Sequence, residues 1–358
     1  MFFNLIHRVF TQYNILTYTT FRSICAFLTS FLIVFILMPK FIVFLKSRQS
    51  GGQPIRDDGP QSHLVTKAGI PTMGGVLIIL AILSCCVIWG NLANKYLLLC
   101  IFVMIGFGLI GALDDYKKLS EHDYHGISPR TKFLLQTVIS VCCCIPIVYC
   151  NNSIDTMLYF PVFKNWIIDL GWFFIPWAVF VITGSSNAVN ITDGLDGLAI
   201  GTVITTAVCF TFICYFAGHS NFANYLNVTY IPGIAEICIF LSSLVGAGLG
   251  FMWYNVPPAK VFMGDTGSVS IGAVLGFISI VSKHELLYAI IGGVFVLETV
   301  SDILQIGYYK STHKRLFKMA PIHHHFEKLG WSESTIVFRF WIISVILGVA
   351  GMSLLKIR

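Results

Sequence analysis

Charge is scarce in this sequence. Asp, Glu, Lys and Arg make up only 11% of the 358 residues, whereas a soluble domain has about 25%. Hydrophobic residues account for 56%, phenylalanine alone occurs 30 times, and the mean hydropathy is +0.79. This composition excludes an ordinary cytosolic enzyme, a disordered chain and a basic protein that binds nucleic acid. It indicates a protein that dissolves in lipid.

Cysteine patterns that would indicate a disulfide framework or a zinc site are also missing. The chain has 11 cysteines, an odd number, and each lies inside or at the edge of an apolar run. None has the spacing to histidine in a polar loop that zinc ligands show. We interpret the cysteines as small apolar residues that face lipid or neighbouring helices.

Long hydrophobic runs, by contrast, are abundant. A helix needs about 20 apolar residues to cross a membrane. The sequence predicts ten such spans, at residues 22–45, 70–90, 95–113, 133–150, 167–183, 197–217, 234–254, 268–281, 286–308 and 335–355. We therefore expect an all-α integral membrane protein that forms a single polytopic domain over residues 1–358.

The predicted loops divide into one basic set and one set with little charge. The basic set is 46–69, 114–132, 184–196, 255–267 and 309–334. It holds fourteen Lys and Arg, against seven in the termini and the alternate loops. Because Lys and Arg concentrate on the cytoplasmic side of membranes, the five loops are expected there and both termini in the periplasm.

Most of the acidic residues also lie in these five loops, so the polar groups gather at one water–lipid boundary. A transporter usually places its ionisable groups near the bilayer midplane instead. The pattern favours an enzyme that joins a soluble cytoplasmic substrate to a lipid. The alternative from another class is an ion-coupled transporter that uses Glu298 and Asp302.

Two adjacent carboxylates, Asp114 and Asp115, close the third predicted span. Acids are disfavoured at the negative end of a helix, and neighbouring carboxylates repel each other. A bound cation would resolve both problems. The simpler interpretation is a solvated helix end that Lys117 and Lys118 neutralise.

The segment Asn187–Gly197 contains two Asn and two Asp but no Lys or Arg. If Asp193 and Asp196 open the next helix, their spacing puts them on one face. Helix capping would explain one such residue. Four of them without a counter-charge indicate a functional site.

Two further motifs lie on the same face. Asp265 sits in a Gly-rich turn at a helix start, where backbone N–H groups can hold a phosphate. The run His323-His324-His325 cannot bind one zinc from a regular helix, because adjacent side chains diverge by about 100°. Imidazole suits phosphate contacts or acid–base chemistry better, and a solvated histidine cluster is the alternative.

These groups together favour phosphoryl transfer. Mg²⁺ binds through one or two carboxylates and the phosphates of its substrate. Phosphoryl transfer chiefly requires positioning and charge neutralisation. The residues therefore predict a magnesium-dependent phosphotransferase at the membrane surface.

The motifs resemble those of the bacterial phospho-N-acetylmuramoyl-pentapeptide-transferases, within the polyprenyl-phosphate sugar-1-phosphate transferase superfamily. The matching pieces are Asp57–His63, Pro71–Gly75, Asp114-Asp115, Asn187–Gly197, Phe262–Ser268 and Met319–His325. The Pro-Ile-His-His-His run is the most specific, because it separates this family from sister N-acetylglucosamine-1-phosphate transferases, the nearest alternative. Ile70 and Asp302 depart from the family pattern.

The resemblance implies a reaction in the bacterial inner membrane. Phospho-N-acetylmuramoyl-pentapeptide would pass from its UDP donor to undecaprenyl phosphate, giving lipid I and UMP with Mg²⁺, as the first membrane step of peptidoglycan synthesis. A homodimer is also what the family suggests.

The resemblance also implies roles for individual residues. Asp265 would be the main metal ligand, and Asp114 or Asp115 would assist the lipid phosphate. The implied catalytic residues are Asp114, Asp115, Asp265 and His323, and the implied substrate-binding residues are Lys67, Asn187, Asn190, Asp193, Asp196, Asn255, His324 and His325.

Overall fold

The computed structural model describes residues 14–49, 52, 67–121, 126–149, 156–161, 163 and 166–357. The long helices are α2 (Thr19–Arg48), α4 (Gly75–Trp89), α5 (Lys95–Glu121), α6 (Pro129–Tyr149), α7 (Phe174–Thr192), α8 (Leu198–Ala217), α10 (Ile237–Asn255), α11 (Gly264–Val281), α13 (Gly293–Thr312) and α15 (Glu333–Ile357). Shorter helices are α9 (Ser220–Leu226), α12 (Glu285–Ile291) and α14 (Ile322–Lys328), with 3₁₀ turns η1 (Asn14–Thr17), η2 (Gly171–Phe173) and η3 (Ile234–Glu236).

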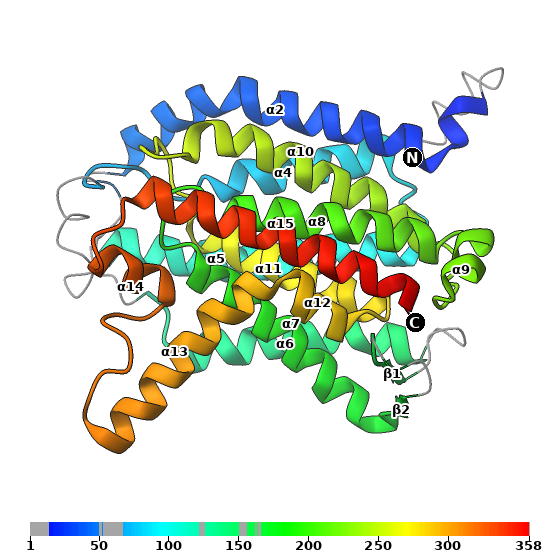
Figure 1. The fold of residues 1–358 in the computed structure, drawn as a ribbon. Coiled ribbons are helices and arrows are strands. Elements are labelled where there is room, and N and C mark those ends of the chain that lie inside the picture. The colour runs from blue at the N-terminus through cyan, green and yellow to red at the C-terminus, as the bar shows by residue number, and fades with distance from the viewer. Residues whose placement is uncertain are drawn as a thin grey trace.

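In the described part of the chain, the strands are two short ones that form a hairpin. β1 (Met157–Tyr159) pairs antiparallel with β2 (Ile167–Asp169), with Met157 opposite Asp169. The hairpin lies at the same end of the molecule as the start of α2 and the end of α15 (Figure 1).

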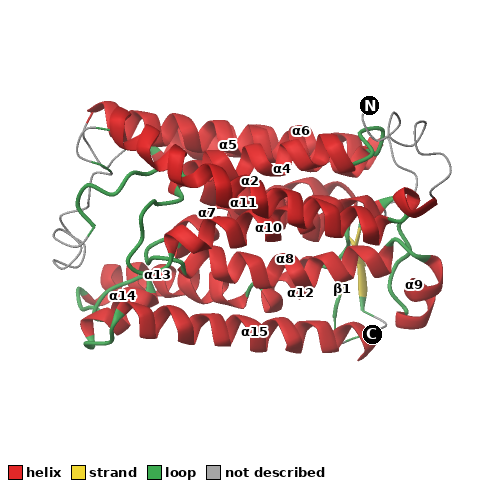
Figure 2. Cartoon of the chain, turned by 90° about the horizontal axis from the view of Figure 1, so that it is seen from above, coloured by secondary structure: helices red, strands yellow, loops and turns green. Residues whose placement is uncertain are grey.

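Helix α11 is the centre of the bundle. In its apolar window 94% of the residues are buried, against 22% in α2 at the edge. Two side chains of α7 join it to α11, because Ser185 Oγ donates to the Gly272 carbonyl at 2.6 Å and Ser186 Oγ to the Val269 carbonyl at 2.8 Å. Seen from above, α5 and α6 lie on one side of α11 and α15 on the other (Figure 2). The residues at the start of α11 are therefore fixed in position by neighbouring helices on several sides.

The structure supports the predicted membrane class. Among the described residues, eight helices are long and apolar enough to cross a membrane, or nine if a bent pair counts as one span. Helix α4 is a shorter apolar helix of 15 residues. This confirms an all-α protein with many apolar helices.

The predicted span 286–308 is not a single straight helix. It divides into α12 and α13, which meet at an angle of 85°. The break falls at Gly292 and Gly293, and glycine pairs are a common cause of sharp helix kinks. Helix α13 consequently slants away from the bundle (Figure 1).

A buried ion pair ties three helices together at the hairpin end. Arg22 Nη1 of α2 lies 2.6 Å from Glu236 Oε1, and Arg22 Nη2 lies 3.0 Å from Glu236 Oε2. Arg22 also donates to the Trp89 carbonyl at the end of α4, while Glu236 accepts the Asn91 N–H at 2.6 Å. Both charges thus have several partners, as buried charges require.

Replacing Arg22 with alanine should destabilise the protein strongly. The change leaves the Glu236 carboxylate buried without its guanidinium, which typically costs about 3–5 kcal/mol. Lys117→Ala is the control, because Lys117 and Glu121 form an exposed pair at 3.9 Å, and such pairs contribute up to about 1 kcal/mol. Thermal unfolding in detergent measures the stability of both variants. Equal losses of stability in the two would contradict a stabilising role for the buried pair.

Candidate active site

The predicted carboxylates meet where the last turns of α5 approach the first turn of α11. Asp114 and Asp115 are both buried, each with 2% of its surface exposed. The sequence had suggested that the two acids close a helix. Helix α5 instead continues to Glu121, so both acids lie inside it. The solvated helix end is therefore wrong as an explanation for them.

Asp115 caps the neighbouring helix α11. Its carboxylate accepts the backbone N–H of Asp265 at 3.1 Å and of Thr266 at 2.9 Å, and the Thr266 hydroxyl at 2.7 Å. A carboxylate at a helix N-terminus satisfies free N–H groups and opposes the positive end of the helix dipole. These N–H groups, which the sequence suggested as a phosphate site, are already bonded. Asp115 fixes the backbone of Asp265.

Asp114 faces two lysines together with Asp265. Lys118 Nζ lies 2.7 Å from Asp114 Oδ2 and 3.2 Å from Asp265 Oδ2. Lys132 Nζ of α6 lies 2.5 Å from Asp265 Oδ2 and 3.6 Å from Asp114 Oδ2. One oxygen of each carboxylate therefore points at a shared pair of cations.

Asn190 orients the other oxygen of Asp265. Its Nδ2 donates to Asp265 Oδ1 at 3.0 Å and to Ser268 Oγ at 2.9 Å. Asn187, about one turn earlier on α7, is bonded instead to Gln136 Oε1 at 3.0 Å and to the Thr183 carbonyl at 2.8 Å. Its described contacts therefore join α7 to α6 rather than to the carboxylates.

Asp193 and Asp196 lie in the loop between α7 and α8. The possibility that they open a helix is wrong, since α7 ends at Thr192 and α8 begins at Leu198. Burial raises the pKa of Asp193 well above its usual range, and the charge of Asp265 raises it further. Asp193 is thus electrostatically part of the same site.

Asp196 belongs to a second cluster with Lys67 and Glu333. Lys67 Nζ lies 2.9 Å from Asp196 Oδ1 and 2.8 Å from Glu333 Oε1. Burial lowers the pKa of Lys67, but the two carboxylates outweigh it and hold that pKa above its ordinary value. Asn255 closes the loop, because its Oδ1 accepts the Gly197 N–H at 3.0 Å.

The three histidines form part of helix α14 and differ in their surroundings. His323 is fully buried, with Nδ1 2.9 Å from Glu298 Oε2. His324 Nδ1 lies 2.5 Å from Glu327 Oε2, and His325 Nδ1 accepts the Lys318 N–H at 3.1 Å. The three Nδ1 atoms thus have three different partners, although the rings of His323 and His324 lie next to each other, with their centroids 4.1 Å apart.

The carboxylates of the described residues could supply part of the coordination shell of a cation, with the remaining ligands coming from the substrate. Within the described ranges, no group of three or more His, Cys, Asp or Glu has the geometry to hold a metal ion. Oxygens of Asp114 and Asp265 nevertheless converge on the ammonium groups of Lys118 and Lys132. Two carboxylates without a full cage match Mg²⁺, which takes its remaining ligands from water and phosphates.

Sequence reasoning missed several residues of this site. It named Lys118 only as a charge that neutralises a solvated helix end, although Lys118 lies four residues after Asp114 on the same helix face and pairs with it. Packing between helices that are distant in the sequence brings three further residues to the site, namely Lys132, Glu333 and Glu298. The motif Asp57–His63 lies outside the described residues.

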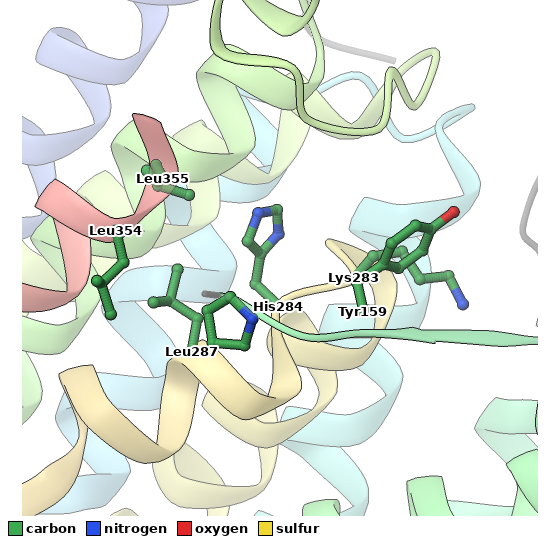
Figure 3. Close-up of a pocket in the computed structure, with 7 residues that line it drawn as sticks. Tyr159, Lys283, His284, Leu287, Leu354 and Leu355 are labelled. Carbon is green, nitrogen blue, oxygen red and sulfur yellow. The ribbon is translucent and has the colours of Figure 1, made fainter. Parts of the chain in front are cut away.

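A pocket at the opposite end of the molecule is separate from these carboxylates. Figure 3 shows its lining, which includes Tyr159, Lys283, His284, Leu287, Leu354 and Leu355. These residues belong to the hairpin, the α11–α12 junction and the end of α15. The predicted site residues described above lie at the other end of the bundle.

Comparison with known proteins identifies the family of the chain. The model of glycosyl transferase family 4 matches residues 95–283, and a phospho-N-acetylmuramoyl-pentapeptide-transferase signature matches residues 67–79. Transferases of that name are 50% identical in Pelagibacter ubique, over all of both chains, and 51% identical in Rickettsia felis, over 96% of both. One from Bartonella quintana is 48% identical over 100% of this chain and 99% of its own.

The chain belongs to the phospho-N-acetylmuramoyl-pentapeptide-transferase family. The predicted family and the predicted transferase class are confirmed, against both the transporter and the sister-enzyme alternatives. The matched signature includes Lys67 and the Pro71–Gly75 motif. The roles of individual residues in this transferase stay predictions.

Alanine at Gly111 should disable the transferase. A Cβ atom there would lie 2.3 Å from the Asp265 carbonyl oxygen and 2.6 Å from the Thr266 nitrogen, so the start of α11 must move. A displacement of about 1 Å in a reacting group can cost about a hundredfold in rate. Turnover measured in detergent is the readout.

Gly184→Ala is the matched control for this substitution. Gly184 lies in α7, and a Cβ atom there meets nothing within 4 Å. Its turnover should stay within about twofold of wild type, since surface substitutions usually change stability little. Wild-type turnover of Gly111→Ala would show that the contact between α5 and α11 does not position Asp265.

Proposed function

We propose that the chain transfers phospho-N-acetylmuramoyl-pentapeptide from its UDP-linked donor to undecaprenyl phosphate, with Mg²⁺, at the end of the bundle that carries Asp114 and Asp265. The observation that carries the location is the convergence of these two carboxylates with Lys118 and Lys132. Full-length similarity to transferases of this name supports the reaction. The products are lipid I and UMP.

The proposal includes an orientation in the bacterial cytoplasmic membrane. Counting α4 and the bent pair α12–α13 as one span each gives the ten crossings that the sequence predicts. The start of α2 and the end of α15 lie at the end of the bundle opposite α14, whose His323 packs against the Gly194 loop of the site (Figure 1). With the basic loops in the cytoplasm, the site faces the cytoplasmic donor and both termini face the periplasm.

Phosphoryl transfer between two anions requires neutralisation of charge. An oxygen of the lipid phosphate attacks the phosphorus that carries the sugar, and the bond to the bridging oxygen breaks so that UMP leaves. Bound Mg²⁺ would supply positive charge to the pyrophosphate. Asp265, oriented by Asn190, and Asp114 are the residues that would hold it. Lys118 and Lys132 would then contact phosphate oxygens.

The attacking phosphate needs orientation more than deprotonation. The second pKa of a phosphate monoester is near 6, so at pH 7 most of it is ionised without a base. Asp115 is bonded to the start of α11 through both oxygens, so its carboxylate is already engaged as a helix cap. We infer that Asp114 is the member of the pair that faces the lipid phosphate.

Asp265→Asn should abolish UMP release in detergent with the UDP donor, undecaprenyl phosphate and Mg²⁺. Loss of this carboxylate removes the main ligand of the cation, and a fall of at least about 10²-fold in kcat is expected. EDTA should have the same effect on wild type. The control Asp169→Asn changes an exposed acid in β2 at the other end, and it should retain activity. UMP release by Asp265→Asn at the wild-type rate would refute the site.

Asp114→Asn and Asp115→Asn should differ in stability. Asn at 115 keeps one acceptor oxygen for three donors of Asp265 and Thr266, so about 1–2 kcal/mol should be lost. Asn at 114 keeps the bond from the Ile127 N–H but loses the charge opposite both lysines, so kcat should fall with little loss of stability. Thermal unfolding and UMP release together separate the two. Equal destabilisation would contradict the capping role of Asp115.

A further inference from the structure

Glu298 is a buried acid of α13 that the proposed reaction does not yet use. Its side chain and that of His323 are both 0% exposed, and Glu298 Oε2 lies 2.9 Å from His323 Nδ1. The same carboxylate oxygen lies 3.5 Å from the His323 backbone nitrogen. A buried carboxylate is stable only when it is paired. Glu298 therefore anchors α14 on α13 through this histidine.

The opposite edge of the His323 ring meets the loop between α7 and α8. A Cβ atom built on Gly194 would lie 2.3 Å from His323 Nε2, so the ring packs directly against the backbone of that glycine. Gly194 follows Asp193 and lies two residues before Asp196. The imidazole is thus a rigid spacer between Glu298 and the loop that carries both acids.

The contact also determines which nitrogen carries a proton. A carboxylate that accepts from Nδ1 holds the ring in one orientation and makes Nδ1 the donor. Nε2 then faces the Gly194 loop, and it has no hydrogen-bond partner among the described residues. Removing Glu298 would free the ring to rotate, and the loop would lose its support.

We propose that Glu298 is a positioning residue of the transfer reaction, which acts through His323 to hold the Asp193–Asp196 loop in place. The inference rests on the proposed function, because the family resemblance implies that Asp193 and Asp196 line the site of the nucleotide-sugar donor. It gives a role to Glu298, a fully buried acid. Among the described residues, Glu298 has no hydrogen bond to Asp114 or Asp265.

The test is steady-state UMP release by the full-length protein in detergent, with the donor and the lipid varied separately. Glu298→Ala should lower kcat/KM for the UDP donor by about 100-fold, and Glu298→Gln, which keeps the shape and one acceptor oxygen, by about 10-fold. The KM for undecaprenyl phosphate should change by less than about twofold, because the proposed function places the acceptor at Asp114 and not at this loop. A purely structural role would not separate the two substrates.

The double variant tests whether Glu298 acts through the histidine. Adding Glu298→Ala to His323→Ala should cost less than about twofold beyond His323→Ala alone, because residues that act as a unit are not additive. Losses that multiply would overturn the inference. Wild-type kinetics in His323→Ala would overturn it as well.

Glu236→Gln is the control for simple destabilisation. Glu236 is a buried acid paired with Arg22 at the far end, so this variant should lower the melting temperature and leave kcat/KM of the folded protein unchanged. If Glu298→Ala does not fold, Glu298→Gln decides, and wild-type donor kinetics in that variant would reject the positioning role. Absence of UMP release by folded wild type would instead reject the proposed function.

Discussion

The cap that Asp115 places on the first turn of α11 is the contact on which the rest of the site depends. A helix start leaves N–H groups unbonded, and in a bundle surrounded by lipid there is little water to satisfy them. Asp115 satisfies those of Asp265 and Thr266 from a different helix. The direction in which Asp265 points is therefore set by α5 as well as by α11. Glycine at 111 permits this close approach.

The two ends of the bundle differ in how their charged side chains are paired. At the hairpin end, Arg22 and Glu236 form a matched pair with additional backbone partners. At the other end, more acids than bases come together: Asp114, Asp115, Asp193, Asp196, Asp265 and Glu333 share Lys67, Lys118 and Lys132. An excess of carboxylates that are buried or partly buried is unfavourable unless a further cation offsets it. The first arrangement serves stability, whereas the second favours a bound cation.

Much of the fold could be predicted from the sequence, because the apolar runs and the one-sided distribution of charge are local properties of the chain. The bend between α12 and α13 was not predicted, since Gly292 and Gly293 only permit a break that packing then selects. The position of Asp114 and Asp115 inside α5 was missed for a related reason. Hydropathy ends a span at the first acids. Here Lys118 and Lys132 neutralise Asp114, Asp115 caps α11, and the helix continues.

The sequence identifies the candidate residues, but it does not show which member of each motif has which role. Asp114 and Asp115 are chemically identical neighbours in the sequence, and nothing in the motif separates them. Adjacent helical side chains diverge by about 100°, so one of the pair turns toward α11 and the other toward the lysines. His323 and His324 likewise have different partners although their rings lie side by side, since His323 pairs with Glu298 and His324 with Glu327. In both motifs the sequence identifies the chemistry, whereas packing against neighbouring helices determines which member of the run can perform it.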